Sequence, residues 1–223
     1  MTDIAAGPPP VRTRYRQPTT RAFAVSPVVA AIPVVAILVL QAVLSVRLLH
    51  ASTVSGDEAL YIYSGHQLIH ELWHGDGSPY YETYFSGAPV IYPVLAATVD
   101  HVGGLALVRL MSCAFMLAAT GLLYITARRL FGYWPTVTAI GLFASLGITQ
   151  SLGVLATYDA LALMLMAFAA YCAVRATDST RFLLAIPALL LLANATKYAT
   201  VLFDPVVIGL ASLLLRPVRD GAV

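Results

Sequence analysis

Long apolar stretches recur along this chain, and they constrain its fold more than any other feature. A run of about 20 apolar residues is long enough to cross roughly 30 Å of hydrocarbon as a helix. Charged residues make up only 11% of the 223 residues, whereas a soluble domain carries about a quarter. We therefore predict an all-α integral membrane protein with about six transmembrane helices. The predicted spans are residues 24–49, 105–127, 133–153, 157–174, 182–196 and 199–215.

The chain divides into one membrane domain, residues 24–216, and two short tails. Residues 1–23 are rich in Pro, Thr and Arg, and this composition predicts a disordered basic tail. No small-residue cleavage site follows the first apolar run, so we expect a permanent span and not a signal peptide. The stretch 182–215 is interrupted by polar residues, so one kinked helix and two short helices both fit it. Residues 217–223 form the second tail.

Arginine residues predict the orientation of the spans. Ten of them flank the predicted spans on one side, and the positive-inside rule names that side cytoplasmic. They are Arg12, Arg14, Arg16, Arg21, Arg128, Arg129, Arg175, Arg181, Arg216 and Arg219. We therefore expect a multi-pass protein of the cell membrane with both ends of the chain in the cytoplasm. A net charge of only +2 gives no indication of nucleic-acid binding.

Polar chemistry is concentrated in residues 50–104, which the layout places in a long first extracytoplasmic loop. This loop holds six of the eleven acidic residues and all five histidines. Residues 57–74 have helical apolar spacing, and residues 90–104 resemble a second short helix. We expect both helices to lie at the membrane surface. Cys113 and Cys172 fall in separate spans and are predicted to be free thiols.

The stretch SGDE at residues 55–58 has both a structural and a functional interpretation. Ser55 and Glu58 have the spacing of a capping box that opens a helix. Asp57 lies just outside the first span, where a carboxylate can accept a proton from an acceptor hydroxyl. The two interpretations are compatible, because a cap holds Glu58 while Asp57 stays free.

The pentapeptide HELWH at residues 70–74 matches the H-E-x-x-H pattern of zinc metallopeptidases. His66 adds a third imidazole to the helix face that carries His70 and His74. A peptidase needs a further ligand from another element, however, and no second signature supplies it. We interpret the match as coincidental. A membrane zinc metallopeptidase, and a divalent metal on these three histidines without proteolysis, remain the alternatives.

Ionisable residues from separate spans are expected to meet at the outer membrane level. Arg109 and Lys197 lie near the outer ends of the second and fifth spans, and Asp159 lies in the turn before the fourth. Cations within a membrane usually mark a binding site or a paired charge. Arg109 and Lys197 are therefore candidates for binding a lipid phosphate. Pairing with Asp159 or Asp204 is the structural alternative.

The order of these motifs resembles the N-terminal half of the membrane glycosyltransferases with the type-C fold. The group concerned is the protein mannosyltransferase and aminoarabinose transferase-like family, family 39 in the broad sense. After the D-E pair come Y-F-S-G-A-P-V-I-Y-P (84–93), R-L-M-S (109–112), Y-I-T-A-R-R-L-F-G (124–132), T-Y-D-A-L-A-L-M-L-M-A-F-A-A-Y (157–171) and T-K-Y (196–198). The resemblance covers about residues 24–216.

The resemblance implies a glycosyltransferase that moves a sugar from a polyprenyl-phosphate carrier to a glycan, lipid or protein acceptor at the outer membrane face. It implies a catalytic role for Asp57, with Glu58 as its partner, and a role at the carrier phosphate for Arg109 and Lys197. Substrate-positioning roles fall to Asp159 and to the aromatic residues Tyr84 and Tyr92, whose rings suit a sugar or a prenyl chain.

This sequence departs from the family pattern in two respects. Gly87-Ala88-Pro89 stands where relatives usually have Pro-Pro, and relatives continue for several more spans. We therefore expect a truncated or split form, with a second chain as the source of the missing half. A non-catalytic membrane subunit that binds the carrier lipid is the remaining alternative. Neither the residues nor the resemblance identifies a cofactor. A divalent metal ion is the candidate cofactor.

Overall fold

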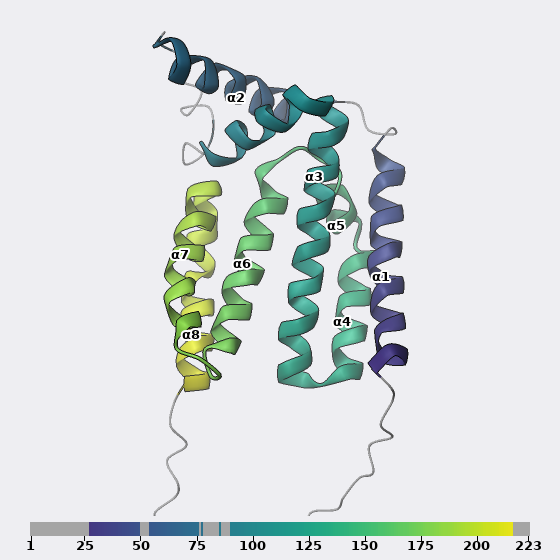
Figure 1. The fold of residues 1–223 in the computed structure, drawn as a ribbon. Helices are drawn as coiled ribbons and strands as arrows, with labels where there is room; N and C mark the ends of the chain where they lie inside the picture. Colours follow the sequence, from purple (N-terminus) through teal and green to yellow (C-terminus); the bar gives the residue numbers. More distant parts are fainter. Residues whose placement is uncertain (1–26, 50–53, 76, 78–84, 86–89, 216–223) are drawn as a thin grey trace, which may run out of the picture.

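A bundle of helices with one helix lying across its end forms the protein (Figure 1). The computed structural model describes residues 27–49, 54–75, 77, 85 and 90–215. The bundle consists of α1 (Pro27–Leu48), α3 (Ile91–Phe131), α4 (Tyr133–Ser145), α5 (Gly147–Leu152), α6 (Tyr158–Arg175), α7 (Arg181–Thr196), η2 (Tyr198–Phe203) and α8 (Asp204–Leu215). The helix across the end is α2 (Gly56–His74). The all-α prediction is confirmed.

Four of the described helical stretches are long and apolar enough to cross a membrane. They are Val29–Leu48, Ile91–Phe131, Tyr158–Arg175 and Tyr198–Leu215, and Arg181–Thr196 is a shorter apolar helix. The outer side of α1 exposes a series of large aliphatic side chains: Val29, Ile32, Val35, Val39, Leu40, Val43 and Val46. Such a surface is costly in water and suits contact with lipid tails.

Two stretches differ in detail from the predicted spans. The predicted span 133–153 is broken at Leu146, whose backbone is extended (φ −66°, ψ 132°) and separates α4 from α5. The side-chain amide of Gln150 donates to the carbonyl of Ser145 at 3.3 Å, which compensates one backbone group freed by the break. The stretch 182–215, which the sequence leaves open, forms two helices joined by the 3-10 helix η2.

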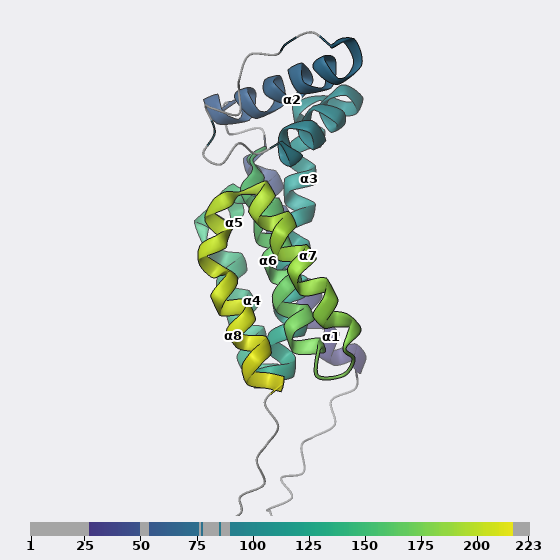
Figure 2. The same ribbon diagram turned by 90° about the vertical axis from the view of Figure 1, so that its left-hand side faces the viewer.

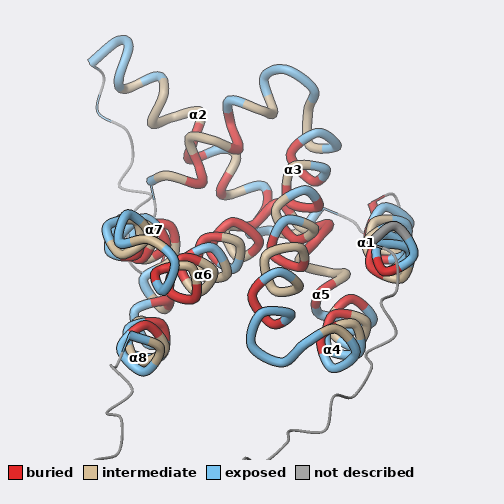
Figure 3. Tube along the Cα trace, turned by 60° about the horizontal axis from the view of Figure 1, so that its bottom comes forward, coloured by how far each residue is buried: buried red, intermediate tan, exposed pale blue. Residues whose placement is uncertain are grey.

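The core lies between α3 and α6, which pack against each other and against α2 and α7 respectively. Figure 3 shows buried residues along α3 and α6, whereas α1, α4 and α8 are exposed on their outer sides. Cys113 and Cys172 are free and buried in these two helices. The centre of the bundle is therefore formed by the segments that also carry Arg109 and Asp159.

A glycine pair divides α3 into two parts. Gly103 and Gly104 have non-helical backbone angles, and Gly104 has a φ of +65° that side chains disfavour. The part before the glycines leaves the bundle direction and packs against α2 (Figure 2). At this contact a Cβ on Gly65 would lie 1.9 Å from the carbonyl oxygen of Pro93, so glycine permits the close approach. The predicted short helix at 90–104 is thus the first part of α3.

Local sequence explains where α2 begins and ends. The Ser55 hydroxyl accepts from the backbone N–H of Glu58 at 3.2 Å, and the Glu58 carboxylate accepts from the backbone N–H of Ser55 at 3.0 Å. This is the predicted capping box. At the other end Gly75 adopts the left-handed conformation and its N–H donates to the carbonyl of Glu71.

Candidate functional site

The predicted site residues gather at the end of the bundle that α2 covers. The first turn of α2 carries Asp57 and Glu58, and the first turn of α6 carries Asp159. Lys197 follows the last residue of α7. The chain direction brings the start of α6 and the end of α7 to the same end of the bundle as α2 (Figure 1). These segments therefore meet at one end of the bundle.

Glu58 and Arg109 form a buried, two-pronged ion pair between α2 and α3. The Nε atom of Arg109 donates to Oε1 of Glu58 at 2.9 Å, and its Nη2 atom donates to Oε2 at 2.8 Å. The side chain of Glu58 is 0% exposed and that of Arg109 is 4% exposed. Paired fork-to-fork geometry of this kind is the strongest form of a charge-assisted hydrogen bond.

Backbone groups from two further segments complete this ion pair. The N–H of Ala156, just before α6, donates to Oε1 of Glu58 at 2.8 Å. The Nη1 atom of Arg109 donates to the carbonyl of Leu49, just after α1, at 2.8 Å. Burial raises the pKa of Glu58, but the hydrogen bonds from Arg109, Ala156 and Ser55 outweigh it and hold this pKa below its ordinary value. The carboxylate is therefore ionised and fully bonded within the protein.

The structure gives Glu58 and Arg109 contacts that differ from the predicted ones. Arg109 was expected to bind a carrier phosphate, and Glu58 to assist Asp57. In the structure, Nε and Nη2 of Arg109 donate to Glu58, and Nη1 donates to the carbonyl of Leu49. These contacts agree with the structural alternative, in which Arg109 pairs with an acidic residue, although that residue is Glu58 and not Asp159 or Asp204. The pair joins α2 and α3 to the backbone at Leu49 and Ala156.

Asp57, by contrast, is exposed in the first turn of α2. Among the described residues it has no hydrogen-bond or ion-pair partner. It thus meets the expectation that the cap holds Glu58 while the neighbouring carboxylate stays available. An available carboxylate beside a bound acceptor is what a general base requires.

Lys197 and Asp159 form a second ion pair, which is partly open to its surroundings. The Nζ atom of Lys197 donates to Oδ1 of Asp159. The lysine side chain is 32% exposed and the aspartate side chain 27%. The ammonium group also lies 5.1 Å from the centre of the Tyr158 ring, a cation–π contact. A lysine has three N–H donors, so it can contact a further anion while it keeps Asp159.

A pocket with one polar end and apolar walls opens beside this pair. Its volume is about 440 Å³, within the usual range for ligand sites. Lys197, Asp159 and Thr200 form the polar end, and α6, η2 and α8 form the apolar walls. The apolar lining consists of Ala162, Leu163, Met166, Ala199, Phe203, Val206 and Val207.

An aromatic cluster connects the pocket to α2. The Tyr61 ring stacks on Phe85 with centroids 4.5 Å apart, and contacts Tyr92 and Tyr158 edge-on at 5.9 and 4.9 Å. Burial, the adjacent Tyr158 and the negative charges of Asp57 and Asp159 all raise the pKa of Tyr61. The carboxylates of Asp57 and Asp159 therefore both contribute to the raised pKa of Tyr61.

Of the two tyrosines predicted to position a substrate, only one can be placed. Tyr92 is fully buried in the cluster, and its hydroxyl has no hydrogen-bond partner among the described residues. Tyr84 lies outside the described residues. Tyr158, which directly precedes Asp159, was not among the predicted site residues. A signal for Tyr158 was available in the sequence. It lies beside Asp159 at the start of a predicted helix, and Lys197 was expected at the same level.

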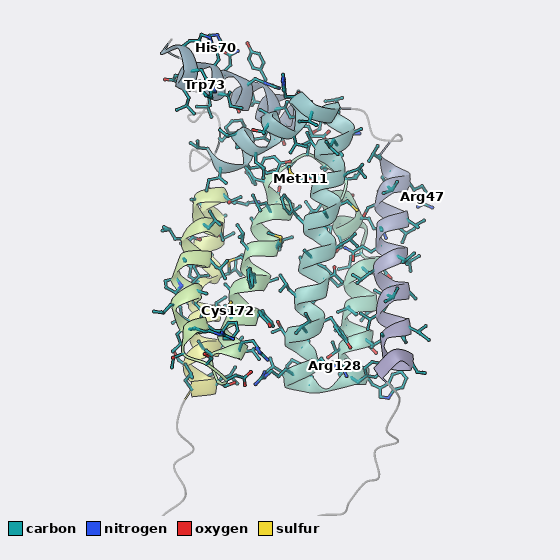
Figure 4. All side chains as sticks on the ribbon, in the orientation of Figure 1. Arg47, His70, Trp73, Met111, Arg128 and Cys172 are labelled. Atoms are coloured by element: carbon teal, nitrogen blue, oxygen red, sulfur yellow. The ribbon has the colours of Figure 1, made fainter. Side chains whose placement is uncertain are left out.

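The histidines of HELWH point away from the candidate site. Figure 4 shows His70 and Trp73 near the free end of α2. The rings of His70 and His74 stack with centroids 4.1 Å apart, while Nε2 of His66 lies 2.9 Å from Oδ2 of Asp100 on α3. Within the described part of the chain, no group of three or more His, Cys, Asp or Glu side chains has an arrangement suited to a metal ion.

Comparison with known proteins identifies one family. A family model described as dolichyl-phosphate-mannose-protein mannosyltransferase matches residues 89–220. The match includes Arg109, Asp159 and Lys197, and it begins after Asp57 and Glu58. No curated protein and no solved structure matches the chain significantly.

Proposed function

The chain belongs to the dolichyl-phosphate-mannose-protein mannosyltransferase family, and from this premise we propose that it uses a polyprenyl-phosphate sugar as its donor. The carrier occupies the pocket between α6, η2 and α8, with its phosphate at Lys197. The acceptor hydroxyl approaches from the side of Asp57. The acceptor is a glycan, a lipid or a protein at the membrane face where α2 lies, which we assign to the outer side.

The pocket is the observation that carries this proposal. The phosphodiester of a polyprenyl-phosphate sugar carries one negative charge on a long apolar chain, and the pocket has one cation at the end of an apolar wall. The wall is built from α6 and from η2–α8, which are long and apolar enough to cross a membrane. A carrier that resides in the bilayer could therefore enter sideways between these segments.

The positions of the charged groups support the following reaction. The acceptor oxygen attacks the anomeric carbon while the bond from that carbon to the phosphate oxygen breaks. The bonding electrons remain on the phosphate oxygen, and the hydroxyl proton passes to the Asp57 carboxylate. Lys197 stabilises the charge that develops on the leaving phosphate. The Glu58–Arg109 pair fixes the first turn of α2 and thus the position of Asp57.

Carrier binding tests the pocket directly. The purified chain is titrated with farnesyl phosphate and, in parallel, with farnesol, which has the same chain but no phosphate. We expect Lys197→Gln to weaken farnesyl phosphate binding at least about tenfold, because a hydrogen bond to a charged group is lost. Arg47→Gln is the matched control. Arg47 is an exposed cation in the last turn of α1, at the same end of the bundle but remote from the pocket (Figure 4).

Two outcomes would contradict the proposed pocket. Equal weakening by Lys197→Gln and Arg47→Gln would mean that general electrostatic attraction, and not a pocket, holds the phosphate. Equal binding of farnesol and farnesyl phosphate would mean that Lys197 contributes nothing.

Sugar transfer tests the role of Asp57. The first donor to try is a polyprenyl-phosphate mannose, as the description of the family suggests. We expect Asp57→Asn to lower transfer at least about 100-fold, the scale of general base catalysis, without loss of folded protein. Glu71→Gln, near the other end of α2, serves as the control and should retain activity. Transfer that survives in Asp57→Asn would exclude the assigned role.

A further inference from the structure

A second polar pocket lies at the end of the bundle farthest from α2. It is formed by the last turns of α3 and α6 and has a volume of about 340 Å³. Arg128, Arg129, Arg175 and Thr126 line it. Figure 4 shows Arg128 at this end of the bundle, opposite His70. The proposed transfer reaction makes no use of this pocket.

The cations of this pocket outnumber the acidic groups beside them. Asp178 accepts from Nη1 and Nη2 of Arg129 and pairs with Nη1 of Arg175 at 3.0 Å. One carboxylate is thus shared by two guanidinium groups, while Arg128 donates to the hydroxyl of Tyr124. Three positive charges therefore face a single negative one, and the excess favours an anion.

Two polar atoms in the pocket wall are buried and unsatisfied. The hydroxyl of Thr126, a residue only 9% exposed, has no hydrogen-bond partner among the described residues. The Nε atom of Arg175, which carries one N–H donor, is also buried and has no partner among the described residues, although the side chain as a whole is 37% exposed. More than nine in ten buried polar groups in proteins have a partner. Two lone donors in the wall of one cationic pocket point to a ligand that brings oxygen acceptors.

We propose that this pocket binds a phosphate group, with Thr126 and Arg175 as its buried donors and Arg128 and Arg129 at its rim. A phosphate offers oxygen acceptors in several directions and a charge that matches the excess of arginine. Both a phospholipid headgroup and free phosphate present this chemistry. The headgroup is the occupant that the position favours, because α3 and α6 are apolar enough to span a membrane and Ile125 of the pocket is exposed beside it.

The test compares three probes on the full chain in neutral detergent. Dioctanoyl phosphatidic acid, dioctanoyl phosphatidylcholine and inorganic phosphate are titrated by calorimetry into wild type and variants. We expect Thr126→Val and Arg175→Gln each to weaken phosphatidic acid binding about tenfold, because each removes a hydrogen bond to a charged group. Thr126→Val keeps the shape of the side chain and leaves every arginine in place. It therefore still tests the site if Arg175→Gln does not fold.

Arg181→Gln is the matched control for charge. Arg181 begins α7 at the same end of the bundle but does not line the pocket, and its guanidinium lies over the Phe182 ring at 5.3 Å. Its loss should change binding by less than about twofold, since an exposed charge outside the pocket is screened by salt. Inorganic phosphate binding as tightly as phosphatidic acid, with the same response to Thr126→Val, would support the site and assign it to free phosphate.

Three results would overturn the proposal. The first is unchanged phosphatidic acid binding in both Thr126→Val and Arg175→Gln. The second is equal binding of phosphatidylcholine and phosphatidic acid. The third is a loss in Arg181→Gln as large as that in Arg175→Gln, which would show diffuse attraction to a basic membrane-facing surface.

Discussion

The two ends of the bundle each hold arginine and a carboxylate, yet the two arrangements differ in kind. Near α2, the Glu58 carboxylate is 0% exposed, and both of its oxygens accept from protein donors, namely Ser55, Arg109 and Ala156. At the far end, Asp178 is 34% exposed and shared by Arg129 and Arg175. Residue type alone does not separate a structural ion pair from a binding site. The difference lies in the paired groups themselves: both oxygens of Glu58 accept from protein donors, whereas Nε of Arg175 has no partner among the described residues.

The largest effect on stability should come from Glu58→Gln. This change leaves Arg109 buried without its counter-charge, and breaking a buried pair typically costs about 3–5 kcal/mol. Unfolding by a denaturing detergent, followed by circular dichroism in mixed micelles, measures the loss. Asp57→Asn next to it is the control and should cost no more than about 1 kcal/mol, the scale of a first-turn carboxylate on a helix dipole. Similar losses in both variants would contradict the distinction between the paired and the free carboxylate.

Lowering the pH should gradually remove the stabilisation that the ionised Glu58 carboxylate contributes. The pKa of Glu58 is lower in the folded protein than in the unfolded chain. Its stabilising contribution is therefore complete above the unfolded pKa, about 4.3, and is lost as pH falls through the folded pKa. We expect the free energy of unfolding to decline below about pH 4. Glu58→Gln should lack this component, and an unchanged acid profile in that variant would attribute the decline to other carboxylates.

The smallest effect should come from Asp178→Asn at the far end. The hydrogen bond from Arg129 lowers the pKa of Asp178, but the pair lies at the surface, where such interactions contribute little. We expect an unfolding transition that differs from wild type only at low salt and coincides with it at high salt. If the carboxylate competes with a phosphate for the arginines, the same variant should bind phosphatidic acid more tightly. A large loss of stability at all salt concentrations would instead make Asp178 a structural partner like Glu58.

Much of the fold could be predicted from local patterns. The apolar runs, the capping box at Ser55 and the short helix at residues 90–104 each depend on neighbours in sequence, and the structure confirms them. The break at Leu146 was missed, because the run around it is apolar on both sides and gives no stronger stop signal than a single glycine.

The partners of the charged residues were harder to predict. The sequence placed Arg109 and Lys197 near one membrane level, and it left pairing and phosphate binding open for both. In the structure the two residues differ in burial, because the Arg109 side chain is buried and the Lys197 side chain is partly exposed. Arg109 meets a carboxylate that lies 51 positions earlier in the chain, whereas Lys197 meets Asp159 beside an open pocket. Such contacts depend on how distant helices pack, which local periodicity does not contain.

The Glu58–Arg109 pair also has a consequence for biosynthesis. Its bonds join residues separated by 51, 60 and 98 positions. The last of these partners, Ala156, is translated after α3, α4 and α5. Until then the nascent chain holds a carboxylate and a guanidinium without their full set of partners. Closure of this bond network is thus a late event in assembly, and a chain arrested before residue 156 cannot complete it.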